Sequence, residues 1–155
     1  MIEKKETLIG SIRDFIKTCP YLREFDDAVT INVDKLSSDT TTYTINEAVF
    51  QPILKKYVDG SSERQYVFVF GSREEYGHDV FENIENIGFF EDFSNWLEVQ
   101  VIQNKVPILG VGKQALTIEA TTNGYAFQTS ESKAIYQIQC KLTYFQKKLM
   151  EEGNN

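Results

Sequence analysis

The sequence predicts an α+β fold, in which a mostly antiparallel sheet packs against an N-terminal helix and a second, long or broken helix. Apolar residues recur at helical spacing in two segments, and they alternate with polar residues in several others. The predicted order is a helix, several strands, a helix and several strands. The 155 residues fit one domain, 1–155, with polar and mobile ends expected at 1–5 and 149–155.

Both predicted helices are recognised by an apolar stripe at positions i, i+4, i+7 and i+8. In the first, residues 4–18, the stripe consists of Leu8, Ile12, Phe15 and Ile16, and Pro20 follows its end. In the second, residues 79–103, the stripe consists of Phe89, Phe93, Trp96 and Leu97. Gly88 interrupts the second segment, so we expect one kinked helix or two short ones.

Alternating or β-forming residues predict strands at 29–33, 39–44, 53–58, 65–70, 116–120 and 136–144. The segment 65–70 (QYVFVF) is apolar on both faces, which predicts a place near the middle of the sheet. The last strand places its apolar residues on one face, namely Tyr136, Ile138, Cys140, Leu142 and Tyr144. Asn123-Gly124 predicts a hairpin turn.

Charge and cysteine usage narrow the classes of function. A formal net charge of −7 disfavours tight nucleic-acid binding, although an acidic surface suits a wall past which DNA slides. Cys19 and Cys140 are predicted to be buried thiols, because two distant cysteines make neither a disulfide framework nor a zinc site. The sequence has no apolar run that would span a membrane and no secretory signal pattern.

We find no residue pattern that predicts catalysis, a cofactor or a metal. His78 is the one histidine, and it is predicted to be a surface or helix-capping residue. The segment Gly110-Val111-Gly112-Lys113 departs from a phosphate-binding loop at Pro107 and Gln114, and it precedes a strand rather than a helix. Acidic residues of the second helical segment lie opposite its aromatic stripe, which predicts a solvated face; they are Glu82, Glu85, Glu91, Asp92 and Glu98.

Three segments resemble a family of siphophage and prophage minor capsid (neck) proteins that are similar to phage tail terminators. They are residues 55–77 (KKYVDGSSERQYVFVFGSREEYG), 84–100 (IENIGFFEDFSNWLEVQ) and 118–146 (IEATTNGYAFQTSESKAIYQIQCKLTYFQ). The family pattern of a Gly-aromatic-Phe-Trp helix is matched by Gly88, Phe89, Phe93 and Trp96. The family hairpin turn falls on Asn123-Gly124, and its Leu-Pro loop is Val106-Pro107 here.

The resemblance implies a tail-terminator-like structural subunit of a long-tailed bacteriophage or prophage, acting in the virion at the head–tail neck. Such a subunit would assemble as a homo-oligomeric ring, expected to be a hexamer, in the host cytoplasm. It would cap the tail tube protein and help join it to the head–tail connector protein. DNA would pass through the ring without specific binding, and neither a membrane nor a cofactor would be involved.

Position and composition predict the segments that contact neighbouring subunits. The Thr-rich strand 39–44 is expected to be an exposed edge, and the polar segments 59–63 and 73–79 are expected to project. The predicted interface residues are Thr41, Thr42, Tyr43, Asp59, Gly60, Ser61, Arg73 and Tyr76.

Two other functions stay open at this point. The first is a head-completion or connector protein of the same particle, because each of these is an oligomerising module without a polar cleft. The second is a small enzyme or ligand-binding protein, which would need convergent polar groups inside an apolar cleft.

Overall fold

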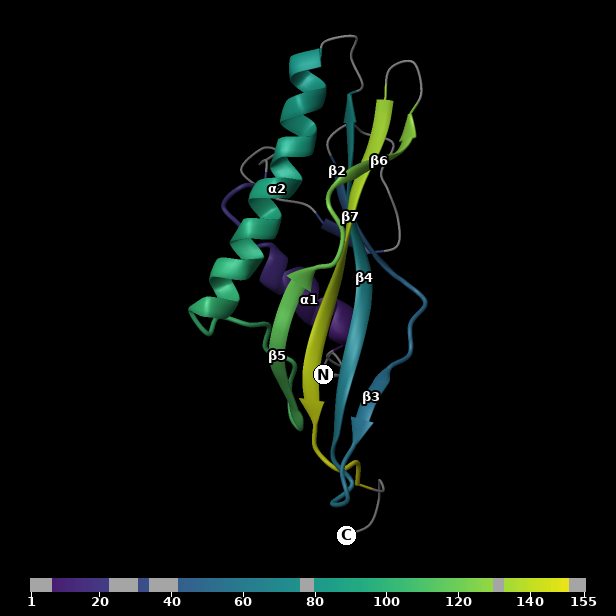
Figure 1. Cartoon of the computed structure of the whole chain (residues 1–155), viewed down its shortest axis with the longest axis vertical. Helices are drawn as coiled ribbons and strands as arrows, with labels where there is room; N and C mark the ends of the chain where they lie inside the picture. Colours follow the sequence, from purple (N-terminus) through teal and green to yellow (C-terminus); the bar gives the residue numbers. More distant parts are fainter. Residues whose placement is uncertain (1–6, 23–30, 34–41, 76–79, 130–132, 151–155) are drawn as a thin grey trace, which may run out of the picture.

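The computed structural model describes residues 7–22, 31–33, 42–75, 80–129 and 133–150. It has an α+β fold with a largely antiparallel seven-stranded sheet and two helices among these residues (Figure 1). The elements in chain order are α1 (Leu8–Ile16), β1 (Ile31–Val33), β2 (Thr42–Glu47), β3 (Ile53–Lys56), β4 (Ser62–Glu75), α2 (Val80–Ile102), β5 (Lys113–Ala120), β6 (Tyr125–Thr129) and β7 (Lys133–Gln146). The predicted fold class is confirmed.

Strand β4 occupies the middle of the sheet. It pairs antiparallel with β7 along its whole length, and with β2 and β3 on its other side. The central place of residues 65–70 is therefore confirmed, and its cause is that both faces of this stretch carry apolar side chains. Strand β1 pairs parallel with β2, from Ile31 opposite Tyr43 to Val33 opposite Ile45.

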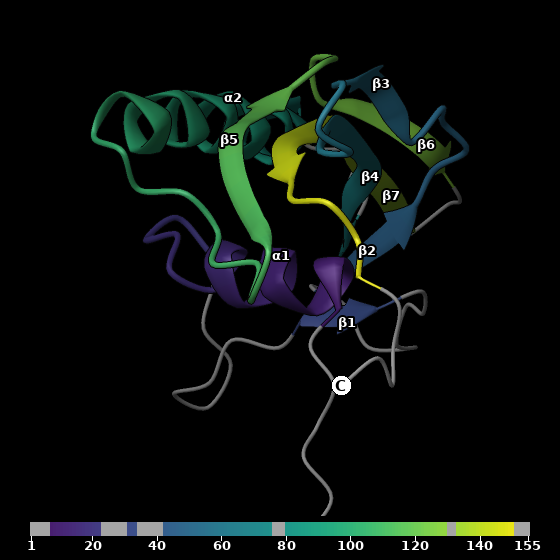
Figure 2. The same cartoon turned by 90° about the horizontal axis from the view of Figure 1, so that it is seen from below.

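One face of the sheet forms the hydrophobic core. The side chains predicted to share one face of β7 are all buried there, at 5% exposure or less. They meet Tyr66, Phe68 and Phe70 of β4, which are equally buried. Both helices contribute to this same core, through Ile12 and Ile16 of α1 and through Phe90, Phe93, Trp96 and Leu97 of α2. Figure 2 shows the curved sheet from its end, with α1 and α2 beside it.

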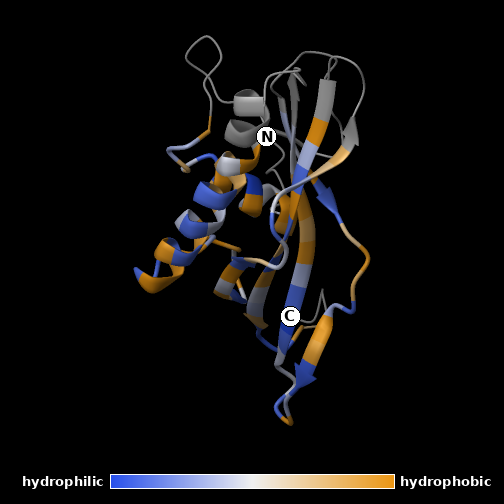
Figure 3. Ribbon diagram, turned by 45° about the horizontal axis from the view of Figure 1, so that its top comes forward, coloured by the Kyte–Doolittle hydropathy of each residue, from blue (hydrophilic) through white to orange (hydrophobic). Residues whose placement is uncertain are grey.

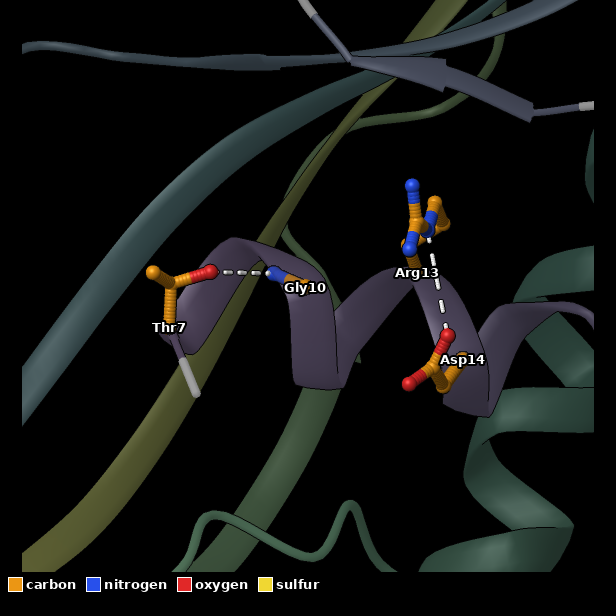
Figure 4. A network of polar contacts seen from close by, with 4 residues as sticks. All are labelled: Thr7, Gly10, Arg13 and Asp14. Carbon is orange, nitrogen blue, oxygen red and sulfur yellow. Dashed lines mark hydrogen bonds and ion pairs between the residues drawn. The ribbon is translucent and has the colours of Figure 1, made fainter. Parts of the chain in front are cut away.

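Helix α1 is shorter than the predicted residues 4–18. It begins after Thr7, whose Oγ1 accepts a hydrogen bond from the Gly10 N–H at 3.1 Å (Figure 4). A side-chain acceptor at this position satisfies one of the N–H groups that the first turn leaves without a helical partner. At the other end, the Thr18 hydroxyl donates to the Phe15 carbonyl at 2.6 Å, and Pro20 follows.

Helix α2 is continuous over 23 residues, so the predicted single helix is confirmed and the alternative of two short helices broken at Gly88 is wrong. A methyl group at Gly88 would meet nothing within 4 Å, because the residue lies on a roomy part of the helix surface. The helix tolerates this glycine at the cost of backbone entropy alone. The stripe predicted from the sequence is buried or half-buried, and Phe90 joins it as a fully buried residue.

The predicted hairpin at Asn123-Gly124 is wrong. Strands β5 and β6 do not pair with each other; both pair with β7, in line along the edge opposite β4. Residues 121–124 join them as an irregular segment, in which the Thr121 N–H donates to the Gln139 carbonyl at 2.7 Å. Gly124 is required for close approach rather than for a turn, because a Cβ there would lie 2.5 Å from Phe90 Cβ.

The alternation predicted for Leu116, Ile118 and Ala120 is interrupted by a register shift between Ala115 and Thr117. Ala115 and Ile118 are therefore the buried residues of β5, whereas Leu116 is 42% exposed. Such a bulge reverses which face a side chain points to, and period-2 counting misses it.

Candidate subunit interface

Polar side chains form no candidate metal site in the described part of the chain. The described residues contain no group of three or more His, Cys, Asp or Glu side chains that could hold a metal ion. None of the described helices is both long and apolar enough to cross a membrane. Lys113 of the glycine-containing loop begins strand β5, as the sequence predicted, and His78 lies outside the described residues.

Both cysteines are buried free thiols, as predicted. Burial raises the pKa of Cys19 to about 11, because the thiolate loses its hydration while the neutral thiol does not. Burial also raises the pKa of Cys140, which lies on β7 opposite Phe68 of β4 and Ala120 of β5. A thiol with a raised pKa is a poor nucleophile near neutral pH.

The predicted interface on the Thr-rich strand needs correction. Strand β2 lies between β1 and β4 in the sheet, so over the residues paired with β1 it is not an edge. Tyr43 is 1% exposed and stacks on Phe70, with 5.6 Å between ring centroids. It is a residue of the hydrophobic core. Thr42 pairs with Arg73 inside the β2–β4 ladder, while Thr41 and Tyr76 lie outside the described residues.

The turn between β3 and β4 lies at one end of the molecule (Figure 1). The Asp59 carboxylate accepts from the Ser61 N–H at 2.9 Å and from the Ser61 hydroxyl at 2.6 Å. These hydrogen bonds hold the pKa of Asp59 below its usual range. Gly60 has φ 94°, in the left-handed region that favours glycine. Asp59 and Gly60 are exposed as predicted, but Ser61 is buried.

Exposed apolar side chains gather around this turn, and we call them the turn-end patch. They come from β3, from the turn and from the residues after β7, and they are Leu54, Tyr57, Val58, Leu149 and Met150. The two chain segments meet here, because the Tyr57 and Phe145 rings lie 6.4 Å apart and the Lys148 side chain lies against Gly60.

A second surface lies at the opposite edge of the sheet, between α2 and β5. An open groove of about 400 Å³ runs between Ser94, Glu98, Val101 and Ile102 of the helix and Thr117–Ala120 of the strand. We call it the α2–β5 groove. Ile102 on its helix side is 74% exposed, and Figure 3 shows hydrophobic residues at the C-terminal end of α2.

The α2–β5 groove was not predicted from the sequence. Its two sides come from segments about twenty residues apart, and only folding brings them together. The signal available in the sequence was apolar residues outside the core stripe, such as Val99 and Ile102 on α2 and Ile108 and Val111 in the following loop. The exposed fractions of these four side chains range from 44% to 101%.

Comparison with known proteins finds no matching family model and no matching curated protein.

Proposed function

We propose that this chain is a structural subunit of a long-tailed bacteriophage or prophage, acting at the head–tail neck. Its copies assemble as a tail-terminator-like ring that caps the tail tube and helps join it to the head. The location in the particle rests on the resemblance of residues 55–77, 84–100 and 118–146. The assembly is supported by two separate surfaces that expose large apolar side chains, the turn-end patch and the α2–β5 groove.

The single observation that carries the assembly is that the turn-end patch and the α2–β5 groove lie at different places on the subunit. Large apolar side chains such as Val58 and Ile102 are 109% and 74% exposed there. Clustered exposed apolar surface marks protein interaction sites. Two different surfaces on each subunit support head-to-tail contacts, which close into a ring when the rotation between neighbours suits.

The charge distribution supports the passage of DNA. Glu91 and Asp92 are exposed on the outer side of α2, as the sequence predicted, and Asn95 beside them is exposed as well. A wall of this kind repels phosphates over roughly 8–10 Å at physiological salt. In the proposed ring, this side of α2 faces the channel, so that DNA moves through without a specific contact.

Light scattering coupled to size exclusion tests the proposal across a range of concentrations. We expect a closed oligomer near six times 17.9 kDa. Incubation of that oligomer with purified tail tubes and, separately, with purified filled heads then locates it. Binding to tube ends supports a terminator. Binding to heads alone favours a head-completion or connector role instead. A monomer at every concentration, with no binding to either structure, contradicts the proposal.

A further inference from the structure

The strand side of the α2–β5 groove is an unpaired sheet edge. Four consecutive residues, Thr117–Ala120, line it, although successive side chains of a strand point to opposite faces. Because residues of both faces line the groove, the groove must reach the backbone of β5 at the edge of the sheet. Strand β5 pairs with β7 on one side and with no other described strand. Alternate N–H and C=O groups of this stretch therefore point into the groove.

The helix side of the groove is a single stripe of α2. Ser94, Glu98, Val101 and Ile102 stand at i, i+4, i+7 and i+8, so they face the same way. A helix stripe beside a free strand edge is the arrangement in which an extended segment binds as an added strand. The main chain of that segment pairs with the edge, and its alternate side chains rest on the helix.

We propose that the α2–β5 groove binds the segment Lys147–Met150 of a neighbouring copy, which adds to β5 as an extra strand. The inference rests on the proposed ring, and it names the contact that joins one subunit to the next. The segment follows β7, has no helix or strand of its own and is exposed throughout. Leu149 and Met150 are 66% and 83% exposed, so they have apolar area to bury.

The charges of the two surfaces are complementary. Glu98 on α2 and Glu119 on the open side of β5 are both exposed, and Glu119 also lies 3.7 Å from Lys141 of its own sheet. Val101 and Ile102 of the helix supply the apolar part of the groove. In an extended segment, Lys147 and Leu149 point one way while Lys148 and Met150 point the other. Whichever of these two pairs of side chains faces α2, that pair contains one lysine and one apolar residue. The lysine of the other pair then faces the side that carries Glu119.

A subunit cannot fill its own groove with this segment. Lys113 of β5 pairs with Gln146, the last residue before the segment. The groove begins at Thr117, four residues further along β5, which is about 13 Å from Lys113. Within its own subunit the segment runs in another direction: the Lys147 N–H donates to the Gly112 carbonyl at 2.8 Å, and Lys148 lies against Gly60. Binding to a neighbour therefore replaces these two contacts. The groove therefore takes the segment from a second copy.

Disulfide trapping between two variants tests the contact directly. Ile102→Cys and Leu149→Cys, one of them labelled with ¹⁵N, are mixed and oxidised mildly, and the mixed dimer is identified by mass. The native thiols do not interfere, because both are buried. The matched control pairs Leu149→Cys with Val49→Cys, since Val49 is 104% exposed in the segment between β2 and β3. We expect about tenfold more mixed dimer than in the control, because docking raises the effective concentration of the two thiols.

Charge reversal provides a second readout. Lys147→Glu with Lys148→Glu should raise the midpoint concentration of assembly about tenfold, and Glu98→Lys with Glu119→Lys should do the same. Combining the four substitutions in one chain should restore assembly. All four side chains are at least partly exposed, so these variants are expected to fold.

The outcomes separate the contact from the ring. If the ring forms, no mixed disulfide appears and charge reversal leaves the midpoint concentration of assembly unchanged, the segment contact is overturned and the proposed function is not affected. A disulfide with no ring supports the contact and contradicts the ring. Absence of both overturns both. A ring with the disulfide and with rescue by the combined variant supports both.

Discussion

The two faces of the β4–β7 pair are covered differently. On one face, Phe68, Phe70, Ile138 and Leu142 are at most 1% exposed under the two helices. On the other face, Val67, Val69, Gln137, Gln139 and Thr143 are half-buried, and neither helix packs on them. The difference separates two environments within one sheet: the covered face forms the hydrophobic core, and the other face stays partly exposed.

Replacing Phe93 by Ala should give the largest effect, because it removes the centre of the covered face. Phe93 is fully buried and stacks on Phe70 at 4.7 Å between centroids. We expect the free energy of unfolding to fall by about 3–5 kcal/mol, measured by urea denaturation. A loss below about 1 kcal/mol would mean that the core is not organised around this ring.

Gly124→Ala tests the packing of α2 against the joint between β5 and β6. The added methyl would meet Phe90 Cβ at 2.5 Å, so we expect a loss of about 1–3 kcal/mol in the free energy of unfolding. Gly88→Ala is the matched control. Nothing lies within 4 Å of its new methyl, and we expect a gain of about 0.5–1 kcal/mol. Effects of equal sign would contradict the close approach at Gly124.

Thr7→Ala removes the N-terminal cap of α1 without touching either face of the sheet. We expect a loss of about 1 kcal/mol in the free energy of unfolding, because the Gly10 N–H loses its side-chain acceptor. Thr7→Ser, which keeps the hydroxyl, is the control. If both variants were equally destabilised, the hydroxyl would not be acting as a cap.

Lys141→Gln should give the smallest effect, because it changes the open face. The Lys141 ammonium lies 3.7 Å from the Glu119 carboxylate, and the two side chains are 33% and 57% exposed. We expect a change below about 0.5 kcal/mol in the free energy of unfolding, as for other exposed ion pairs. A larger loss would indicate that the open face contributes to the core of the subunit.

The covered face was predictable and the edges were not. The buried residues of β7 were named from their alternation alone, because the strand is regular over 14 residues. The break between β5 and β6 escaped prediction, since it depends on Gly124 meeting Phe90 from a distant helix. The prediction that Tyr43 lies on an exposed edge was wrong for a similar reason. The pairing of β1 with β2 and the stacking of Tyr43 on Phe70 are tertiary contacts, which the local sequence pattern does not reveal.

The continuous ladder between β4 and β7 has a mechanical consequence. It joins fourteen residue pairs without a register shift, from Ser62 opposite Gln146 to Glu75 opposite Lys133. Antiparallel hydrogen bonds stand perpendicular to the strands. A force applied between Ser62 and Lys133 loads every rung together in shear, whereas a force between Ser62 and Gln146 opens the rungs one at a time. Single-molecule pulling through these two pairs of attachment points should give a clearly higher rupture force for the first, and equal forces would refute the expectation. A ladder of this length therefore resists a load applied along its strands.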